Sequence, residues 1–133
     1  MNLTDRFFSL GAMPPFDALP ADELMKIADV ARSRSFAPDA SLGQEGSPML
    51  RLHVVVAGCF RSPDGGRAPS ILGLTGVLYD EPSPVTWKAD PVEGASTLSI
   101  GRGHLFTILY ACPRLTLGLL DRRAALPTVG PRP

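Results

Sequence analysis

The sequence is poor in cysteine and has no excess charge of either sign. Its 133 residues include two cysteines, Cys59 and Cys112, which are too few for a disulfide framework and are not spaced as CxxC. We interpret both as free thiols in a reducing compartment, and a bridge between them is not indicated. Thirteen basic side chains balance thirteen acidic ones, so no net field attracts the chain to nucleic acid or to an anionic membrane. We therefore expect neither DNA binding nor membrane binding by this chain alone.

Long apolar runs are also missing. The segment FFSLGAM near the N-terminus is shorter than a membrane span and has no basic leader before it. This pattern predicts neither a signal peptide nor a transmembrane helix, and hence a cytoplasmic location. A chain of this length is expected to form one domain with a substantial core.

Glycine and proline, in contrast, are abundant. There are 13 glycines and 14 prolines, a share that is typical of short strands joined by tight turns rather than of a helical bundle. Pro20 is expected to begin a helix, because a residue in the first turn needs no N–H. Its apolar face is expected to consist of Leu24, Ile27, Ala28 and Ala31, which recur at helical spacing. The predicted strands start near residue 41 and cover 50–56, 59–61, 70–74, 86–89 and 96–100, and two helical segments follow at 104–111 and 115–120.

The strongest extended segment, residues 50–56, is rich in valine. Ala57-Gly58 is expected to end it or to form a bulge, and the Pro-Asp-Gly-Gly run predicts a hairpin turn over residues 62–66. His53 lies in this strand and His104 near a helix start. The two histidines lack the H-x-H…E…H spacing of a metal site in a cupin-type barrel, and no Ser-His-Asp or Cys-His arrangement is visible. We therefore assign no catalytic residue and no metal.

Several segments, in the same order, resemble one known domain family. FDALPADELMKIADVARSRSFAPDASLGQEGSP is similar to an entry segment "F..L...EL..IA" followed by "F.PG..L..EG.P", with Asp39 where glycine is usual. LHVVVAGCFR is similar to "LYVV.SG.VR", and ASTLSIGRGHLFTILYACPRLTLGLL to the exit segment "...L..I.R..F..LL...P.L...LL". These segments resemble the cyclic-nucleotide-binding domain family, the effector module of catabolite-activator-type regulators.

The resemblance covers about residues 14–120 and implies the fold. We expect a mainly β domain with flanking helices: a β-roll, that is, a double-stranded β-helix jelly roll, between an N-terminal and a C-terminal helix. We predict a loosely attached lead-in over residues 1–13, this domain over 14–121 and a flexible tail over 122–133. Because the chain ends soon after the second helical segment, it resembles a stand-alone effector domain without a DNA-binding part.

The stretch GLTGVLYDEPSPVTWKA, residues 73–89, occupies the position of the family's phosphate-binding cassette. In the family, a Gly-Glu pair leads a short helix that ends near an Arg-Ala-Ala/Ser-Thr run. Backbone N–H groups and the arginine hold the cyclic phosphate, and the glutamate binds the ribose 2′-hydroxyl. In a first register, Gly73 is the cassette glycine, Leu74 replaces the glutamate and Ser83 replaces the arginine.

A second register, which we favour slightly, starts at Gly76. Glu81 is then the ribose ligand, Asp80 replaces a glycine, and the cassette helix that follows is shortened by about two turns. This register leaves more room for the hairpin after Gly58.

Both registers lose the phosphate arginine. The nearest cations, Arg61, Arg67 and Lys88, do not fall at the matching position. One lost charge-assisted contact costs about 1.5–3 kcal/mol, which weakens binding roughly tenfold to a hundredfold. Pro82 and Pro84 also remove two N–H donors. We therefore predict a degenerate cassette. Its candidate ligand-binding residues are Gly73, Gly76, Asp80, Glu81, Ser83 and Thr86.

These features indicate a non-catalytic regulatory or sensory domain. We expect binding of its candidate ligand, a cyclic nucleotide such as cAMP or cGMP, to be weak, altered or absent. An alternative is a ligand-free interaction domain, a homodimer or a complex with an effector protein. Apolar residues from Phe7 to Met13 or from Leu115 to Leu120 would then be buried against a second protomer. A weaker alternative is a cupin-like small-barrel enzyme.

Overall fold

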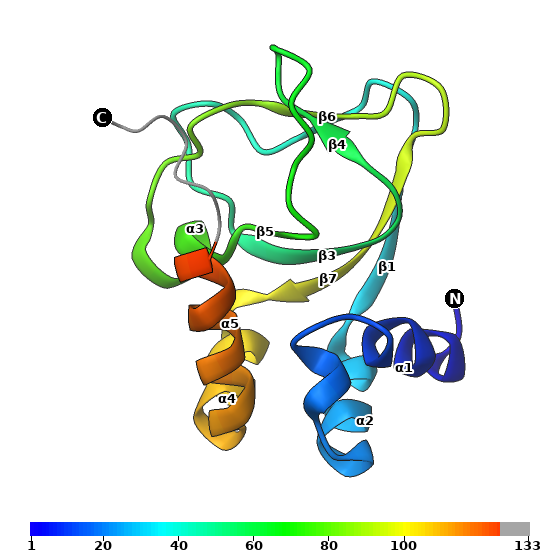
Figure 1. Ribbon diagram of the computed structural model, residues 1–133, viewed down its shortest axis with the longest axis vertical. Coiled ribbons are helices and arrows are strands. Elements are labelled where there is room, and N and C mark those ends of the chain that lie inside the picture. Colours follow the sequence, from blue (N-terminus) through cyan, green and yellow to red (C-terminus); the bar gives the residue numbers. More distant parts are fainter. Residues whose placement is uncertain (126–133) are drawn as a thin grey trace.

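Two antiparallel sheets form the upper part of the molecule as Figure 1 shows it, and most of the helices lie below them. The computed structural model describes residues 1–125, with side chains as far as Leu119. The larger sheet has the order β1 (Arg32–Phe36), β7 (Ala95–Gly101), β3 (Arg51–Gly58) and β5 (Ile71–Leu72). The smaller sheet has the order β2 (Ser41–Leu42), β6 (Trp87–Ala89) and β4 (Phe60–Arg61). Because neighbouring strands are distant in the sequence, the chain passes repeatedly between the sheets and forms a roll.

Helices pack against one face of the larger sheet. The elements α1 (Leu3–Gly11), η1 (Phe16–Ala18) and α2 (Ala21–Val30) precede the strands, and α4 (Arg102–Ala111) and α5 (Pro113–Ala125) follow them. Their apolar side chains form a core with alternate residues of the two central strands, namely Leu52, Val54, Leu98 and Ile100. The mainly β fold with helices at both ends is therefore confirmed.

A second apolar cluster fills the space between the sheets. Its buried members are Leu42, Met49, Phe60, Leu72, Ala89 and Ala95. Phe36 and Trp87 pack against this cluster from the two sheets. The interior of the roll is thus occupied by side chains of the chain itself.

The N-terminal segment is more firmly attached than the sequence suggested. Asn2 caps α1 in a reciprocal capping box with Asp5, and Leu10 is fully buried in the helical core. Arg6 donates from Nε to the Ala28 carbonyl of α2 at 2.8 Å. Our description of residues 1–13 as a loosely attached lead-in is therefore wrong: a capped helix packs here, and Leu3 and Phe8 are its exposed large apolar residues.

The predicted turns and the bulge are confirmed. Pro20 is the N-cap of α2. The pairing of β3 with β7 shifts register between Val55 and Ala57, and Ser62 donates its N–H to the Gly66 carbonyl across the hairpin turn. Asp39 has a φ of 65°, a left-handed conformation that glycine adopts without strain, which explains why a glycine is usual at this position.

The C-terminal helix continues beyond the predicted end of the domain. Residues 122–125, assigned to a flexible tail, belong to α5. Residues 126–133, the rest of that predicted tail, lie outside the described residues. No helix among residues 1–125 is both long enough and apolar enough to cross a membrane.

Candidate ligand-binding cassette

The cassette stretch folds into a short helix between two left-handed residues. Helix α3 (Leu74–Tyr79) has Gly73 at its N-cap, with a φ of 93°, and Asp80 at its C-cap, with a φ of 56°. A Cβ on Gly73 would collide with the Arg51 carbonyl, so the backbone conformation and the close approach both require glycine. At the other end, the Asp80 N–H donates to the Gly76 carbonyl at 3.0 Å.

Gly76 lets α3 lie directly against the chain before β3. A Cβ at this position would be 2.5 Å from the carbonyl oxygen of Met49 and 2.7 Å from its backbone nitrogen. Val77, the next residue, is fully buried. No side chain caps the N-terminus of α3, so this close packing helps to hold the start of the helix in place.

The position of α3 distinguishes the two registers. The helix begins directly after Gly73, where the first register puts the cassette glycine, and residues 81–86 contain no helix. The second register shortens the cassette helix after Glu81 by about two turns, so the position of α3 favours the first register. The choice between the two registers stays a prediction. In the first register, Leu74 takes the place of the ribose-binding glutamate, and its side chain packs against the helical core.

Ser83, which stands at the arginine position of the first register, is buried and hydrogen-bonded both to its own loop and to the turn at residues 46–47. It is 8% exposed. Its N–H donates to the Ser47 carbonyl and its carbonyl accepts from the Gly46 N–H, both at 2.9 Å. Its Oγ donates to the Val85 carbonyl at 2.6 Å. The hydroxyl proton therefore has an internal acceptor, and the position carries no positive charge.

The other candidate residues near the loop also make structural contacts. The Thr86 hydroxyl accepts from the Glu45 N–H at 2.9 Å. The Glu81 N–H donates to the Thr75 carbonyl at 3.4 Å. The structure brings Gly73, Gly76, Asp80, Glu81, Ser83 and Thr86 together in one helix and the loop after it. Their roles toward a ligand stay predictions.

A cation reaches the cassette from a position that the sequence did not indicate. Arg102, the first residue of α4, donates from Nε to the Val77 carbonyl at 2.9 Å and from Nη2 to the Asp80 carboxylate at 2.8 Å. It thereby satisfies a carbonyl near the C-terminal end of α3, where a cation is favourable. Because the contact joins residues more than twenty positions apart, no local pattern predicts it. Asp80 neutralises the guanidinium, so Arg102 is not a free substitute for the missing arginine.

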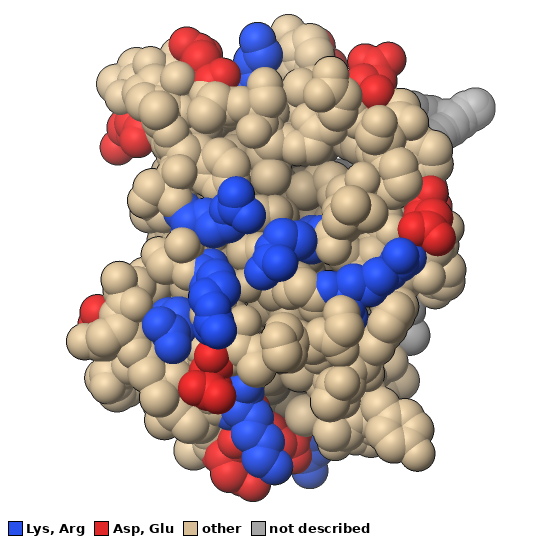
Figure 2. Space-filling view, turned by 180° about the vertical axis from the view of Figure 1, so that it is seen from behind, with Lys and Arg blue, Asp and Glu red and all other residues tan. Residues whose placement is uncertain are grey.

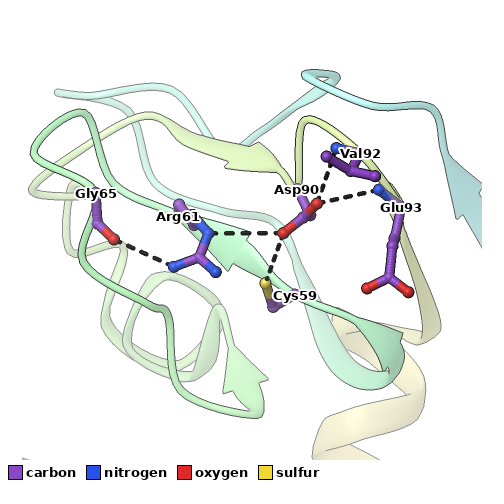
Figure 3. A network of polar contacts seen from close by, with 6 residues as sticks. All are labelled: Cys59, Arg61, Gly65, Asp90, Val92 and Glu93. Atoms are coloured by element: carbon purple, nitrogen blue, oxygen red, sulfur yellow. Dashed lines mark hydrogen bonds and ion pairs between the residues drawn. The ribbon is translucent and has the colours of Figure 1, made fainter.

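Arg61, one of the nearby cations, is bound in another network (Figure 3). Its Nε lies 3.7 Å from Asp90 Oδ2, and its Nη1 donates to the Gly65 carbonyl at 3.3 Å. The other carboxylate oxygen of Asp90 accepts two backbone N–H groups, from residues 92 and 93, at 2.8 and 3.0 Å. These bonds hold the pKa of Asp90 below its ordinary value. The Cys59 thiol donates to the same carboxylate at 3.6 Å, so the network joins β4 to the turn after β6.

A pocket near this network is separate from the cassette. This pocket of about 320 Å³ is lined by residues 55–60 and 67–70, where the hairpin leaves the bulged end of β3. None of the predicted site residues lines it. The cassette therefore does not open into this pocket.

His53 is a core group rather than a ligand. It is 4% exposed, and its Nδ1 lies 3.0 Å from the Thr97 hydroxyl. Burial, followed by the charges of Arg34 and Arg51, lowers its pKa to about 4, so the ring is neutral near pH 7. Among the residues that the structure describes, no group of three or more His, Cys, Asp or Glu is placed to hold a metal.

The fold has close counterparts among solved structures, although no family model matches the sequence and no curated protein matches it significantly. The N-terminal domain of a transcriptional regulator from Streptomyces coelicolor is 27% identical, with a TM-score of 0.64 over 87% of each chain. The cAMP-bound PfPKA-R is 18% identical, with a TM-score of 0.75 over 91% of this chain and 43% of that one.

A third similar structure is the regulatory subunit of a cAMP-independent protein kinase A from Trypanosoma brucei, solved as a triple mutant with cAMP in its A site. It is 18% identical, with a TM-score of 0.70 over 94% of this chain and 49% of that one. The chain thus spans less than half of the two kinase regulatory proteins.

The fold and the cassette together define the class of this domain: a two-sheet roll with a short helix inserted before β6 and helices at both ends. It is the fold of cyclic-nucleotide-binding domains, as the sequence segments indicated.

Proposed function

We propose that this chain is a non-catalytic regulatory domain in which cyclic nucleotide binding is weak or absent. The observation that carries the proposal is the state of Ser83, a buried hydroxyl bonded to the Val85 carbonyl where the family's phosphate arginine is expected. Among the described side chains, no guanidinium stands at the position of Ser83, and the Arg102 guanidinium is paired with Asp80. The loss is about 1.5–3 kcal/mol of binding free energy from this contact alone.

The structural neighbours support both halves of this proposal. One is bound to cAMP. The Trypanosoma brucei subunit, described as cAMP-independent, holds cAMP in a mutant in which a threonine is replaced by arginine, together with two changes to alanine. We infer that the fold can be kept while the arginine that supports binding is lost.

Isothermal titration with cAMP and with cGMP tests the proposal. We expect no saturable heat for the unchanged protein below millimolar ligand. A double variant, Leu74→Glu with Ser83→Arg, supplies the two missing side chains of the first register and should bind cAMP measurably more tightly. If the unchanged protein binds with a micromolar dissociation constant, the proposal is overturned. Circular dichroism of the double variant checks that a buried arginine has not unfolded it.

A second candidate function, a protein interaction domain that needs no ligand, is favoured by the exposed apolar side chains of the helices. Phe8 is 68% exposed, Tyr110 93% and Leu117 63%. Such side chains are candidates for burial against another protomer or an effector protein. Sedimentation velocity over a range of concentrations measures self-association, and a monomer at high concentration would remove the homodimer.

A further inference from the structure

The larger sheet ends in an exposed strand that neither the core nor the cassette uses. β1 is the terminal strand in the order β1-β7-β3-β5, and β7 is its strand partner among the described residues. The first four residues of β1, 32–35, are all exposed, although their side chains alternate between the two faces of the sheet. The outer edge of β1 therefore presents backbone N–H and C=O groups that no described strand pairs.

The arginines of β1 lie on one face of the sheet. Arg32 is opposite Ser99 and Arg34 is opposite Thr97, so both share the face of these two buried polar residues. Arg51 of β3 belongs to the same face, because its Nε donates to the Ser99 hydroxyl. Seen from behind, Lys and Arg side chains gather across the middle of the molecule, with Asp and Glu mainly toward its margins (Figure 2).

These three arginines have no carboxylate partner among the described side chains. The ion pairs found there are Arg61–Asp90 and Arg102–Asp80. Arg32 donates to two backbone carbonyls at the end of α2, at 3.0 and 3.2 Å, which orients the guanidinium without neutralising it. A chain with a formal net charge of zero thus has a local positive field along one sheet edge.

A second copy of this chain does not suit the edge. Antiparallel pairing of β1 with another β1 that keeps all the arginines on one face would place Arg32 opposite Arg34. Like charges directly opposite each other destabilise a strand pair. An extended peptide with carboxylates suits it better. Side chains on one face of a strand recur every second residue, roughly 6.6–6.8 Å apart, so acidic residues at alternate positions would lie opposite Arg32 and Arg34.

We propose that β1 is the docking edge for an extended acidic segment of a partner protein, which adds to the larger sheet as a further strand. Backbone hydrogen bonds to the outer edge of β1 supply the general attraction, and the carboxylates select acidic sequences through Arg32 and Arg34. The proposal does not depend on whether the cassette binds a nucleotide.

Fluorescence anisotropy with a labelled octapeptide of alternating Glu and Thr tests this proposal on the full chain. We expect saturable binding, and no binding of the matching octapeptide of alternating Lys and Thr. Two methylated forms of the Glu-Thr octapeptide test the backbone pairing. In one, the alternate backbone nitrogens that face the edge in one pairing register are methylated, and in the other, the remaining set is methylated. Methylation removes hydrogen-bond donors without changing the charge of the peptide. One of the two methylated peptides should lose binding, because only one set of N–H groups faces β1.

Two double variants serve as a matched pair. Arg32→Glu with Arg34→Glu should weaken binding of the Glu-Thr octapeptide by about tenfold or more. Arg67→Glu with Lys88→Glu, which reverses two exposed charges of the smaller sheet and its hairpin, should change it less than about twofold. Three results would overturn the proposal: equal weakening of binding by the two double variants, unchanged binding of both methylated peptides, or tighter binding of a DNA oligonucleotide of the same charge. Circular dichroism confirms that each variant is folded.

Discussion

The cassette and the edge strand β1 differ in whether their arginines are paired with carboxylates. In the cassette, Arg102, which contacts α3, is paired with Asp80, and the Ser83 hydroxyl is bonded to the Val85 carbonyl. On β1, Arg32 and Arg34 are exposed and have no carboxylate partner among the described side chains. The described charged and polar groups of the candidate cassette are thus bonded internally, while the exposed arginines of β1 lie elsewhere. If this contrast is correct, substitutions in the cassette should affect folding and substitutions on β1 should affect association.

The largest expected effect on stability comes from Gly76→Ala in the cassette. The added Cβ would meet the Met49 backbone at 2.5 and 2.7 Å, so the helix or the chain before β3 must move. We expect a loss of about 3 kcal/mol in the free energy of unfolding. The matched change on the edge strand, Ser33→Ala, should cost less than about 0.5 kcal/mol, because Ser33 is exposed. Urea denaturation measures both, and similar losses would break the contrast.

The second prediction concerns the pH dependence of stability and the buried His53, whose pKa is lowered by burial and by the charges of Arg34 and Arg51. Its pKa falls from 6.5 to about 4 in the folded chain, mainly through burial. The unfolded chain therefore binds more protons between these values, so stability is full above pH 6.5 and decreases as the pH falls toward 4. The loss amounts to about 3 kcal/mol.

Urea denaturation at several pH values, compared with His53→Gln, isolates this contribution. The free energy of unfolding of this variant should depend less on pH between 6.5 and 4 than that of the unchanged protein. Asp64 and Asp90 also have lowered pKa values, but their carboxyl groups titrate below this window. If the free energy of unfolding of the variant depends on pH as strongly as that of the unchanged protein, His53 is not the cause of the pH dependence.

Arg102→Ala should have a smaller effect. It removes the bond to the Val77 carbonyl and the ion pair with Asp80. The ion-pair side chains are 39% and 65% exposed, so solvent screens their attraction, and the total loss should be about 1 kcal/mol. Hydrogen exchange should show the loss locally, as faster exchange of the α3 amides. No change in α3 would mean that Arg102 does not hold the cassette.

Asp80→Gly should have the smallest effect. Glycine relieves the left-handed conformation at a φ of 56°, but it loses the ion pair and makes the unfolded chain more flexible. These contributions oppose each other, so we expect a net change within about 0.5 kcal/mol. Asp80→Val keeps the strain without the ion pair and should cost more, and thermal unfolding compares the two. Equal stability of the two variants would show that backbone strain at this position is unimportant.

Local patterns predicted much of the fold. Pro20, the valine-rich strand and the hairpin glycines each act through neighbouring residues, so their consequences could be read from the sequence. The helix α1 was missed, because the capping box of Asn2 and Asp5 and the packing of Leu10 in the core were not expected of a loosely attached segment. The sequence left the cassette register open, because the register depends on how closely Gly73 and Gly76 approach Arg51 and Met49, more than twenty positions away. The contacts of Arg102 and the unpaired arginines of β1 are likewise matters of tertiary arrangement.

The most direct test of the central claim is a calorimetric titration of the full chain with cAMP near pH 7. If the charged and polar groups of the candidate cassette are bonded internally, the unchanged protein gives no saturable heat below millimolar cAMP, and the Leu74→Glu, Ser83→Arg variant binds more tightly than the unchanged protein. A micromolar dissociation constant for the unchanged protein would contradict the account, because it would require an anion contact that Ser83 and the paired Arg102 do not provide.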